Sequence, residues 1–265
     1  MTPPIGPADL ESAADVDRLA HRVWGHSMRS TGVIHVAAVW RRSPETLLTL
    51  RIQENTPRSD YDAFALHLTR ARADAIVTTG RILRSEPALR HTLQGPGTLP
   101  SALAEWRRGA LGKTAPPVSL VLTGSGDVDL DHPLFSGPGR ALIYTGRAAA
   151  WELESRALDY GVEIVAVDRP SPEGAVDLLR RQFGAATVAI EAGPSAAAGL
   201  YGSPPEVDEL LLTTYRAEGL PTGVRGPRFL EPRRISAALR RSSEPFHAAA
   251  DEAGASWELV RRWRG

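Results

Sequence analysis

The sequence predicts a single α/β domain built on a mixed, mainly parallel sheet. Five short and mostly apolar runs have the length of strands that are buried on both faces, and helical patterns separate several of them. Strands that alternate with helices along a chain usually lie parallel in one sheet, with the helices packed on its faces. The length of 265 residues suits one such domain.

The individual elements follow from spacing and composition. Apolar residues at three- and four-residue spacings predict a helix over residues 9–24, strands follow at 33–40 and 47–52, and Ser59 is placed to cap a helix over 60–71. The five buried strands are expected at 75–79, 118–122, 141–145, 162–167 and 187–190, and the helices at 148–159, 173–183 and 195–201. A strand is expected at 208–215, a turn-rich stretch at 221–232, and a terminal antiparallel pair of 234–242 with 256–264. We therefore divide the chain into a tail and helix, residues 1–30, and one α/β domain, residues 31–265.

Composition excludes several classes of protein. The 31 basic and 31 acidic residues balance, so the charge excess of a nucleic-acid or membrane-surface protein is absent. Without cysteine there are no disulfides and no thiol catalysis, and the seven histidines show no metal-binding spacing, so no metal site is predicted. No apolar run approaches the roughly 20 residues that cross a bilayer, and no secretory signal is visible. We expect a cytoplasmic protein that binds a small molecule, with no nucleic acid and no membrane.

Glycines and small hydroxylated residues follow four of the expected strands. The stretches are Thr-Thr-Gly-Arg at 78–81, Thr-Gly-Ser-Gly at 123–126, Thr-Gly-Arg at 145–147 and Glu-Ala-Gly-Pro-Ser at 191–195. In an open parallel sheet the carboxyl ends of the strands share one edge, where backbone N–H groups of such residues can approach phosphate oxygens. The pattern predicts a nucleotide-sized anionic ligand, although each glycine alone is also explained as a turn. The strict three-glycine Rossmann motif is absent, which disfavours a standard dinucleotide fold.

Two charged residues at these strand ends suggest specific roles. The Arg81 guanidinium follows a strand-ending glycine and suits bidentate recognition of a phosphate. A solvated loop arginine is the equally good alternative. Glu191 ends an apolar strand, so it either has a buried polar partner or faces a cleft. We favour the cleft because Gly193 and Ser195 follow at once.

Residues 187–211, TVAIEAGPSAAAGLYGSPPEVDELL, contain a strand that ends in Glu, an Ala-Gly-Pro-Ser turn, a helix of small residues and a Val-Asp-Glu-Leu strand start. This pattern resembles the reductase domain of the bifunctional riboflavin-biosynthesis deaminase-reductase, a relative of dihydrofolate reductase. Residues 68–89, 118–135 and 141–146 resemble further segments of that family in the same order, so the resemblance covers about residues 47–215. The deaminase half of the family has no counterpart in this chain.

The resemblance implies a three-layer dihydrofolate reductase-like fold, a homodimer, and NADPH-dependent reduction of 5-amino-6-(5-phosphoribosylamino)uracil or a related small heterocycle. The implied cofactor-binding residues are Thr79, Gly80, Arg81 and Ser85, then Thr123 and Ser125 at the adenosine end, and Gly193, Pro194, Ser195 and Ala196 near the nicotinamide. Glu191 and Leu89 are the implied substrate-binding residues, and Arg90 could replace a basic residue of the family that binds a substrate phosphate. The family supplies no catalytic residue that we can transfer, and hydride chemistry is carried by the cofactor.

The chain departs from the family pattern at the substrate end. Residues 50–57 lack the Ser/Thr-Leu-Asp-Gly segment of the family, and the phosphate-binding basic residue is replaced by Thr92. Two alternatives to an enzyme therefore stay open. One is a non-catalytic nucleotide-binding or regulatory protein that keeps the cofactor cradle, and the other is an interaction scaffold whose glycines only make turns.

Overall fold

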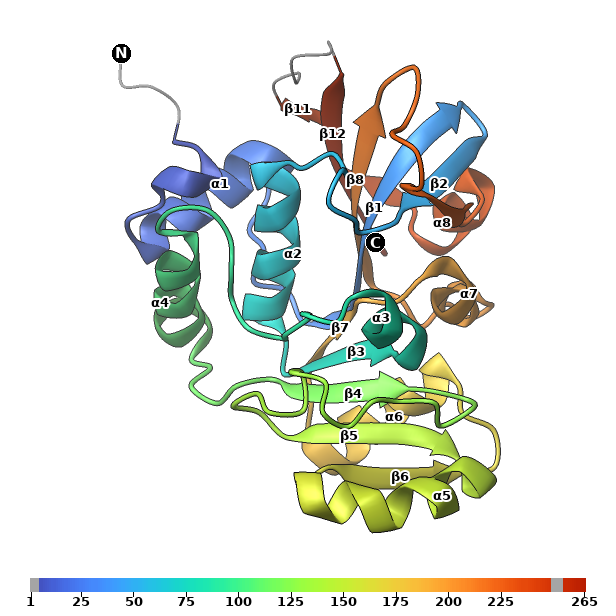
Figure 1. The fold of residues 1–265 in the computed structure, drawn as a ribbon. Coiled ribbons are helices and arrows are strands. Elements are labelled where there is room, and N and C mark those ends of the chain that lie inside the picture. The colour runs from blue at the N-terminus through green and yellow to red at the C-terminus, as the bar shows by residue number, and fades with distance from the viewer. Residues whose placement is uncertain (1–4, 249–254) are drawn as a thin grey trace.

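The computed structural model describes residues 5–248 and 255–265. Within this part of the chain, twelve strands form one sheet, whose main path runs β10-β12-β8-β1-β7-β3-β4-β5-β6 (Figure 1). The strands are β1 Gly32–Ser43, β2 Thr46–Leu50, β3 Ala75–Thr79, β4 Val118–Leu122, β5 Ala141–Gly146, β6 Glu163–Val167, β7 Thr187–Ile190, β8 Glu209–Arg216, β9 Arg225–Arg228, β10 Arg241–Ser242, β11 Phe246–Ala248 and β12 Ser256–Trp263. The strands from β8 to β6 along this path are parallel, and β12 pairs antiparallel with β8. The predicted mixed, mainly parallel sheet is confirmed.

Helices cover both faces of the sheet and give the molecule three layers (Figure 1). They are α1 Ala13–Trp24, α2 Asp60–Arg72, α3 Gly80–Ser85, α4 Leu99–Leu111, α5 Arg147–Ala157, α6 Pro172–Phe183, α7 Pro194–Ala197 and α8 Pro232–Ala238, with the 3-10 turns η1 Pro7–Asp9, η2 Leu158–Tyr160 and η3 Ala198–Tyr201. The helices α6, α7 and α8 pack on one face of the sheet. On the other face, α1, α2 and α4 cover β1 and β8, while α3 and α5 cover β4 and β5.

Strands with continuous apolar sequence are buried on both sides, as the sequence predicts. On β1, Val33 belongs to the core under α6 and α8, while its neighbour Ile34 belongs to the core under α1 and α2. Alternation of side chains across a strand places the two residues on opposite faces. The strands β3, β4 and β7 have the predicted bounds residue for residue, because burial on both faces makes a strand a short and mostly apolar run.

The N-terminal helix α1 is part of the same packed body. It contacts α4 and β12, and Trp24 at its end stacks on Phe64 of α2 with ring centroids 5.7 Å apart. Ser12 caps α1 and Ser59 caps α2, each by accepting a hydrogen bond from a first-turn amide, and the second cap is the one predicted. The division into residues 1–30 and 31–265 stays a prediction.

Several elements differ from the sequence prediction. The strand β9 lies in the stretch that was expected to be turn-rich, and the strand β11 was not predicted. Residues 234–242 were expected to be a strand, but most of them belong to α8, and only β10 pairs with β12. Pro232 opens α8 at a position that suits proline, and Ile235 packs in the core with Ala238 and Leu239 at helical spacing. The helices α3 and α4 were not predicted. In α4 the apolar residues recur with helical spacing, but glycines and prolines on both sides of it suggest a loop.

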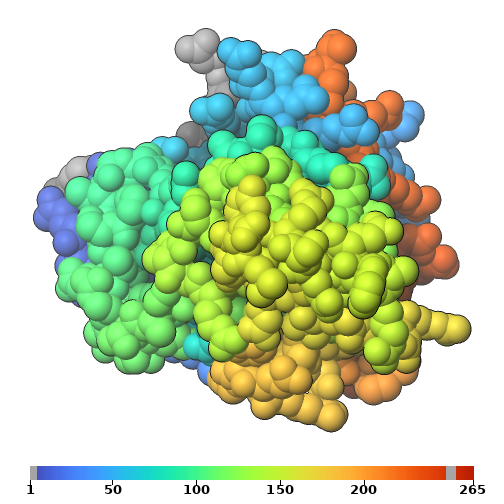
Figure 2. All heavy atoms as spheres, turned by 60° about the horizontal axis from the view of Figure 1, so that its bottom comes forward, coloured from blue at the N-terminus to red at the C-terminus, as the bar shows by residue number. Residues whose placement is uncertain are grey.

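The C-terminal part of β1 extends beyond its pairing with β7. There β1 pairs with β2, and β2 pairs with β9. Arg51 and Val224, and Asn55 and Thr222, connect the segments that continue from β2 and precede β9. In Figure 2 these light-blue and orange residues stand side by side, above the yellow-green residues of β5 and β6. This extension forms a wall beside the carboxyl ends of the parallel strands. None of the helices in the described ranges is long and apolar enough to cross a membrane.

Candidate functional site

A cleft of about 1440 Å³ opens at the carboxyl ends of β3, β4 and β7. One wall is the β2 and β9 extension, with Thr49 to Gln53, Pro227 and Phe229, and another is the inner face of α2, with Asp62, Leu66, His67 and Arg70. Between them lie residues 36–38 of β1, the segments 79–82, 84–90 and 122–125, and residues 191–196. A drug-sized ligand occupies a pocket of roughly 300–1,000 Å³, so this cleft has room for more than one such molecule.

All of the predicted binding residues line this one cleft. They are Thr79, Gly80, Arg81, Ser85, Leu89, Arg90, Thr123, Ser125, Glu191, Gly193, Pro194, Ser195 and Ala196. Three of the four glycine-containing strand ends therefore meet, as expected for parallel strands that stop at one edge. The fourth, residues 145–147 at the end of β5, lies outside the cleft lining, and there Arg147 pairs with Asp168 at 2.5 Å.

The turn that begins at Glu191 leaves open space around its glycine. Gly193 has φ −66° and ψ 166°, an ordinary extended conformation, and a Cβ at this position would meet nothing within 4 Å. Pro194 then opens α7, and the amides of Ala196 and Ala197 donate to the Gly193 carbonyl. A Cβ on Gly124 of the β4 turn would also meet nothing within 4 Å. Neither glycine is required by the packing of the protein itself, so the free space at both is available to a ligand.

The segment after β3 forms the helix α3, which was not predicted. The Thr79 hydroxyl caps this helix by accepting from the Ile82 amide at 3.3 Å. Gly80 permits the close approach of the β3 and β4 ends, because its Cβ would lie 3.3 Å from the Thr123 side chain. Arg81 is exposed at the cleft, as both of its alternative interpretations require.

Glu191 combines the two roles that the sequence left as alternatives. It lines the cleft and is also the partner of Arg70 of α2, whose Nε and Nη2 each lie 2.7 Å from one of its carboxylate oxygens. The two side chains are only 4% and 9% exposed. Arg70 Nη1 also donates to the carbonyls of Arg90 and Thr92 at 2.9 and 3.2 Å. The pair therefore joins α2, the end of β7 and the 90–92 segment at the floor of the cleft.

The Arg70 guanidinium decides the charge of Glu191. Burial by itself would raise the pKa of Glu191, but the charge and hydrogen bonds of Arg70 outweigh it and hold that pKa below the usual value. Glu191 is therefore an ionised hydrogen-bond acceptor at neutral pH and cannot serve as a proton donor.

Two other carboxyl groups of the cleft are shifted in the opposite direction. Burial raises the pKa of Asp62 to about 6. Burial also raises the pKa of Glu86, and the nearby charge of Glu191 raises it further. In both groups the shift favours the protonated carboxyl, opposite to the shift of Glu191.

The histidines beside this cluster are neutral. Burial lowers the pKa of His67 to about 4, and it lowers the pKa of His91 to about 4 as well. His67 lines the cleft and accepts a hydrogen bond from the Gln94 amide at 3.3 Å. With neutral imidazoles, the charge at the floor of the cleft is set by Arg70 and the carboxyl groups.

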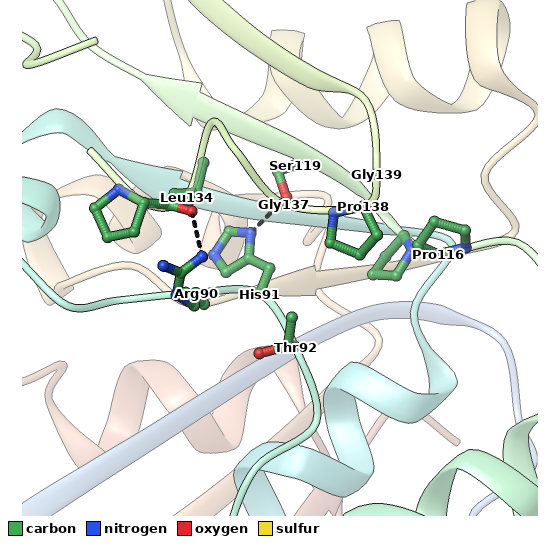
Figure 3. A pocket seen from close by; sticks show the side chains of 11 residues that line it. Arg90, His91, Thr92, Pro116, Ser119, Leu134, Gly137, Pro138 and Gly139 are labelled. Atoms are coloured by element: carbon green, nitrogen blue, oxygen red, sulfur yellow. Dashed lines mark hydrogen bonds between the residues drawn. The ribbon is translucent and has the colours of Figure 1, made fainter. Parts of the chain in front are cut away.

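Arg90 borders a second, much smaller cavity next to the cleft. Figure 3 shows this cavity, of about 10 Å³, with Arg90 donating to the Pro133 carbonyl at 3.2 Å and His91 Nδ1 lying 2.9 Å from Ser119 Oγ. A space of this size holds about one water molecule. Arg90 thus reaches the cleft from a position that is already anchored to the 133–139 loop.

The α2 residues were not recognised in the sequence. Asp62, Leu66, His67 and Arg70 lie on the α2 face that lines the cleft, whereas Phe64, Ala65, Leu68 and Ala71 form its core face. A polar helix face usually means contact with water. Only the fold shows that this face is turned toward the ends of the parallel strands.

The architecture, with helices on both faces of a mainly parallel sheet, is the predicted three-layer dihydrofolate reductase-like fold, and it is similar to the folds of solved reductase structures. The chain is similar to RibD of Acinetobacter baumannii, with a TM-score of 0.57 and 14% identity over 90% of this chain and 59% of that one. It is similar to a pyrimidine reductase-like protein of Corynebacterium diphtheriae, with a TM-score of 0.62 and 20% identity over 92% and 98% of the two chains. It is also similar to the riboflavin biosynthesis reductase Rib7 of Saccharomyces cerevisiae, with a TM-score of 0.54 and 11% identity over 93% and 97%.

The predicted resemblance to the reductase domain is confirmed at the level of the fold, and it extends beyond residues 47–215 to at least 90% of the chain. The chain spans 59% of the length of RibD. No family model and no curated protein matches the sequence.

Proposed function

We propose that this protein is an NADPH-dependent reductase of the pyrimidine-reductase type, acting on 5-amino-6-(5-phosphoribosylamino)uracil or a related small heterocycle. The observation that carries the proposal is the meeting of the predicted cofactor and substrate residues in one cleft. These residues come from chain segments more than a hundred positions apart, and the likeness of the fold to reductase structures supports the same reading. The homodimer and the cytoplasmic location remain predictions.

The cleft fits a dinucleotide cofactor on the side of its glycines. The open space at Gly193 and Gly124 allows close approach of a ligand to the main chain. Thr123 and Ser125 would hold the adenosine end, and the turn from Gly193 to Ala196 would hold the nicotinamide end. NADPH, when bound, would supply the hydride, and the protein would supply position and electrostatics.

The carboxyl groups of the cleft suit a nitrogen heterocycle as substrate. Ionised Glu191, fixed by Arg70, offers an acceptor for ring or amino N–H groups. Burial raises the pKa of both Asp62 and Glu86, so these are the carboxyl groups that would exchange a proton with the substrate. The residues of the chain thus divide into an ionised acceptor that orients the substrate, Glu191, and two carboxyl groups with raised pKa that would transfer a proton.

A non-catalytic cofactor-binding protein is the second candidate. The engagement of Arg90 with the Pro133 carbonyl favours it, because a substrate phosphate would have to compete for that guanidinium.

Thermal unfolding and NADPH oxidation separate these functions. NADPH at about 100 times its Kd should add about 2.7 kcal/mol of stability and raise the Tm. Addition of the aminopyrimidine phosphate should then consume the NADPH absorbance. A raised Tm without NADPH oxidation on a panel of pyrimidine phosphates would support the non-catalytic cofactor-binding protein. An unchanged Tm would rule out both the reductase and the non-catalytic binding protein.

Arg81→Ala is expected to reduce the preference for NADPH over NADH. A charge-assisted hydrogen bond contributes about 1.5–3 kcal/mol, so the loss should be on the order of 10- to 100-fold in relative affinity. Titration of both cofactors against wild type and variant measures it. Arg84→Ala is the matched control, because Arg84 is another exposed arginine of the cleft but is engaged by Asp127. An unchanged preference in Arg81→Ala would exclude Arg81 as the phosphate ligand.

A further inference from the structure

A histidine is buried directly behind the turn that begins at Glu191. His35 lies on β1 opposite Ile190, at the last position where β1 pairs with β7. Its side chain is completely buried, with the rings of Tyr201 and Phe229 at centroid distances of 5.8 and 5.6 Å. Beyond this position the chain leaves β7 and enters the cleft lining, so His35 fills the place where the two strands separate.

Both imidazole nitrogens of His35 have a partner, and the partners determine the tautomer. Nε2 lies 3.3 Å from the carbonyl oxygen of Ala192, and Nδ1 lies 2.9 Å from the Tyr201 hydroxyl. A carbonyl oxygen only accepts, so Nε2 carries a proton. Burial lowers the pKa of His35 to about 4, which leaves the ring neutral at pH 7. Nδ1 therefore accepts from the Tyr201 hydroxyl, and Nε2–H donates to Ala192.

These two hydrogen bonds connect β1 to both ends of the segment 192–201, which contains the turn, α7 and η3. Ala192 stands at its start, and Tyr201 closes η3, which follows α7. The surrounding core is apolar, with Val33, Ile190 and Phe229 among its members. Burial of an imidazole without hydrogen-bond partners would cost about 1–3 kcal/mol of stability. The two hydrogen bonds of His35 offset this cost, which an apolar side chain at the same position would not have.

The bond to Ala192 also fixes the orientation of the next amide. In a planar trans peptide the C=O and the following N–H point in opposite directions. Because the Ala192 oxygen faces the buried imidazole, the N–H of Gly193 faces away from it. Ala192 and Gly193 both line the cleft, and the space beside Gly193 is open. The side of the 192–193 peptide that faces away from His35, where the Gly193 N–H lies, is therefore the side of the cleft.

We infer that His35 is a positioning residue that presents the Gly193 N–H to the cleft as a hydrogen-bond donor for an acceptor oxygen of the bound cofactor. The ligand part of this inference rests on the proposed function. The orientation of the peptide does not, because it follows from the contacts of the protein alone.

Substitution of His35 tests the inference through NADPH affinity. His35→Phe keeps a planar ring but removes both hydrogen bonds, and NADPH should bind on the order of 10-fold more weakly, as expected for the loss of one oriented donor. His35→Gln can donate to Ala192 from its amide nitrogen and accept from Tyr201 with its oxygen. It should therefore restore most of the affinity, whereas a failure of rescue together with a folded variant would count against the positioning role.

A spectroscopic readout without cofactor keeps this test separate from the proposed function. The ¹⁵N signals of the His35 imidazole should show the Nε2–H tautomer, and the Gly193 amide should give one resonance that shifts or splits in His35→Phe. The Nδ1–H tautomer, or an unchanged Gly193 resonance in that variant, would overturn the inference. A wild-type protein with the expected signals but no affinity for NADPH would instead contradict the proposed function.

Ile34→Ala is the control for general loss of stability. Ile34 is the neighbour of His35 on β1, and its side chain is buried in the core on the other side of the sheet. Its truncation should lower the Tm while NADPH affinity and the Gly193 resonance stay as in wild type. Equal losses of affinity in Ile34→Ala and His35→Phe would show that weakened folding explains both, and the positioning role would be rejected.

Discussion

Arg70→Ala is expected to destabilise the protein by about 3–5 kcal/mol, the usual cost of removing one partner from a buried ion pair. The variant leaves the Glu191 carboxylate without its bidentate partner at a site where both side chains are nearly inaccessible to water. The carbonyls of Arg90 and Thr92 lose their donor as well. Urea unfolding at pH 7 measures the loss, and the proposed substrate should be turned over poorly or not at all.

The pH dependence of this loss has a definite sign. Arg70 holds the folded-state pKa of Glu191 below its ordinary value of 4.5, so the pair contributes stability above that value. This contribution disappears as the pH falls through the lowered folded pKa. The stability difference between wild type and Arg70→Ala should therefore be largest near neutral pH and shrink in acid. A difference that stays constant down to acid pH would contradict the assignment to Glu191.

Arg72→Ala provides a matched control for activity. Arg72 is also on α2, is fully buried, and binds both carboxylate oxygens of Glu209 at 2.8 and 2.7 Å. Glu209 begins β8, so it lies at the amino ends of the parallel strands, whereas the cleft lies at their carboxyl ends. This variant should also lose stability, though less, because Arg261 still pairs with Glu209. It should keep NADPH affinity and kcat/KM, and equal activity losses in both variants would leave Arg70 with a structural role only.

The sequence predicts the centre of this fold better than its periphery, and the reason is burial. Strands such as β3, β4 and β7 are covered on both faces, so they are short, mostly apolar runs whose bounds are visible in the sequence. The segment that contains α8 is half-exposed and short, so its apolar residues fit a strand as well as a helix. Tertiary contacts of Ile235 and Leu239 decide for the helix.

The candidate site divides in a similar way. Glycines at strand ends have a local meaning, so Gly80 and Gly193 could be selected from the sequence and both reach the cleft. Arg70 could not, because one of 31 basic residues gives no local sign that its partner lies 121 positions away. His35 is hidden for the same reason, since its partners Ala192 and Tyr201 join it only when β1 is placed beside β7. Long-range polar pairs depend on topology, which a local pattern does not contain.

Gly193→Val is expected to abolish measurable NADPH binding without unfolding the protein. The backbone at φ −66° and ψ 166° accepts a β-branched residue before Pro194, and the new Cβ would meet no protein atom within 4 Å. Stability should stay the same or rise by about 0.4–1 kcal/mol, because valine restricts the unfolded chain more than glycine does. The valine side chain would project into the space where the cofactor must approach the main chain. A displacement of about 1 Å at such a site costs on the order of 100-fold, and calorimetric titration with NADPH measures it.

Gly146→Val tests whether the loss of NADPH affinity depends on where the glycine lies or follows from any glycine-to-valine change at a strand end. Gly146 is the last residue of the parallel strand β5, has nearly the same backbone angles of −71° and 153°, and has equally open space at its Cβ. It lies outside the cleft lining, at the N-terminus of α5. The two substitutions are thus alike in their effect on the chain and differ in the volume that they fill. If NADPH affinity falls only in Gly193→Val, the cofactor lies against the turn after β7. If it falls equally in both, or in neither, the cofactor does not occupy the space beside Gly193 and the cradle is wrongly placed.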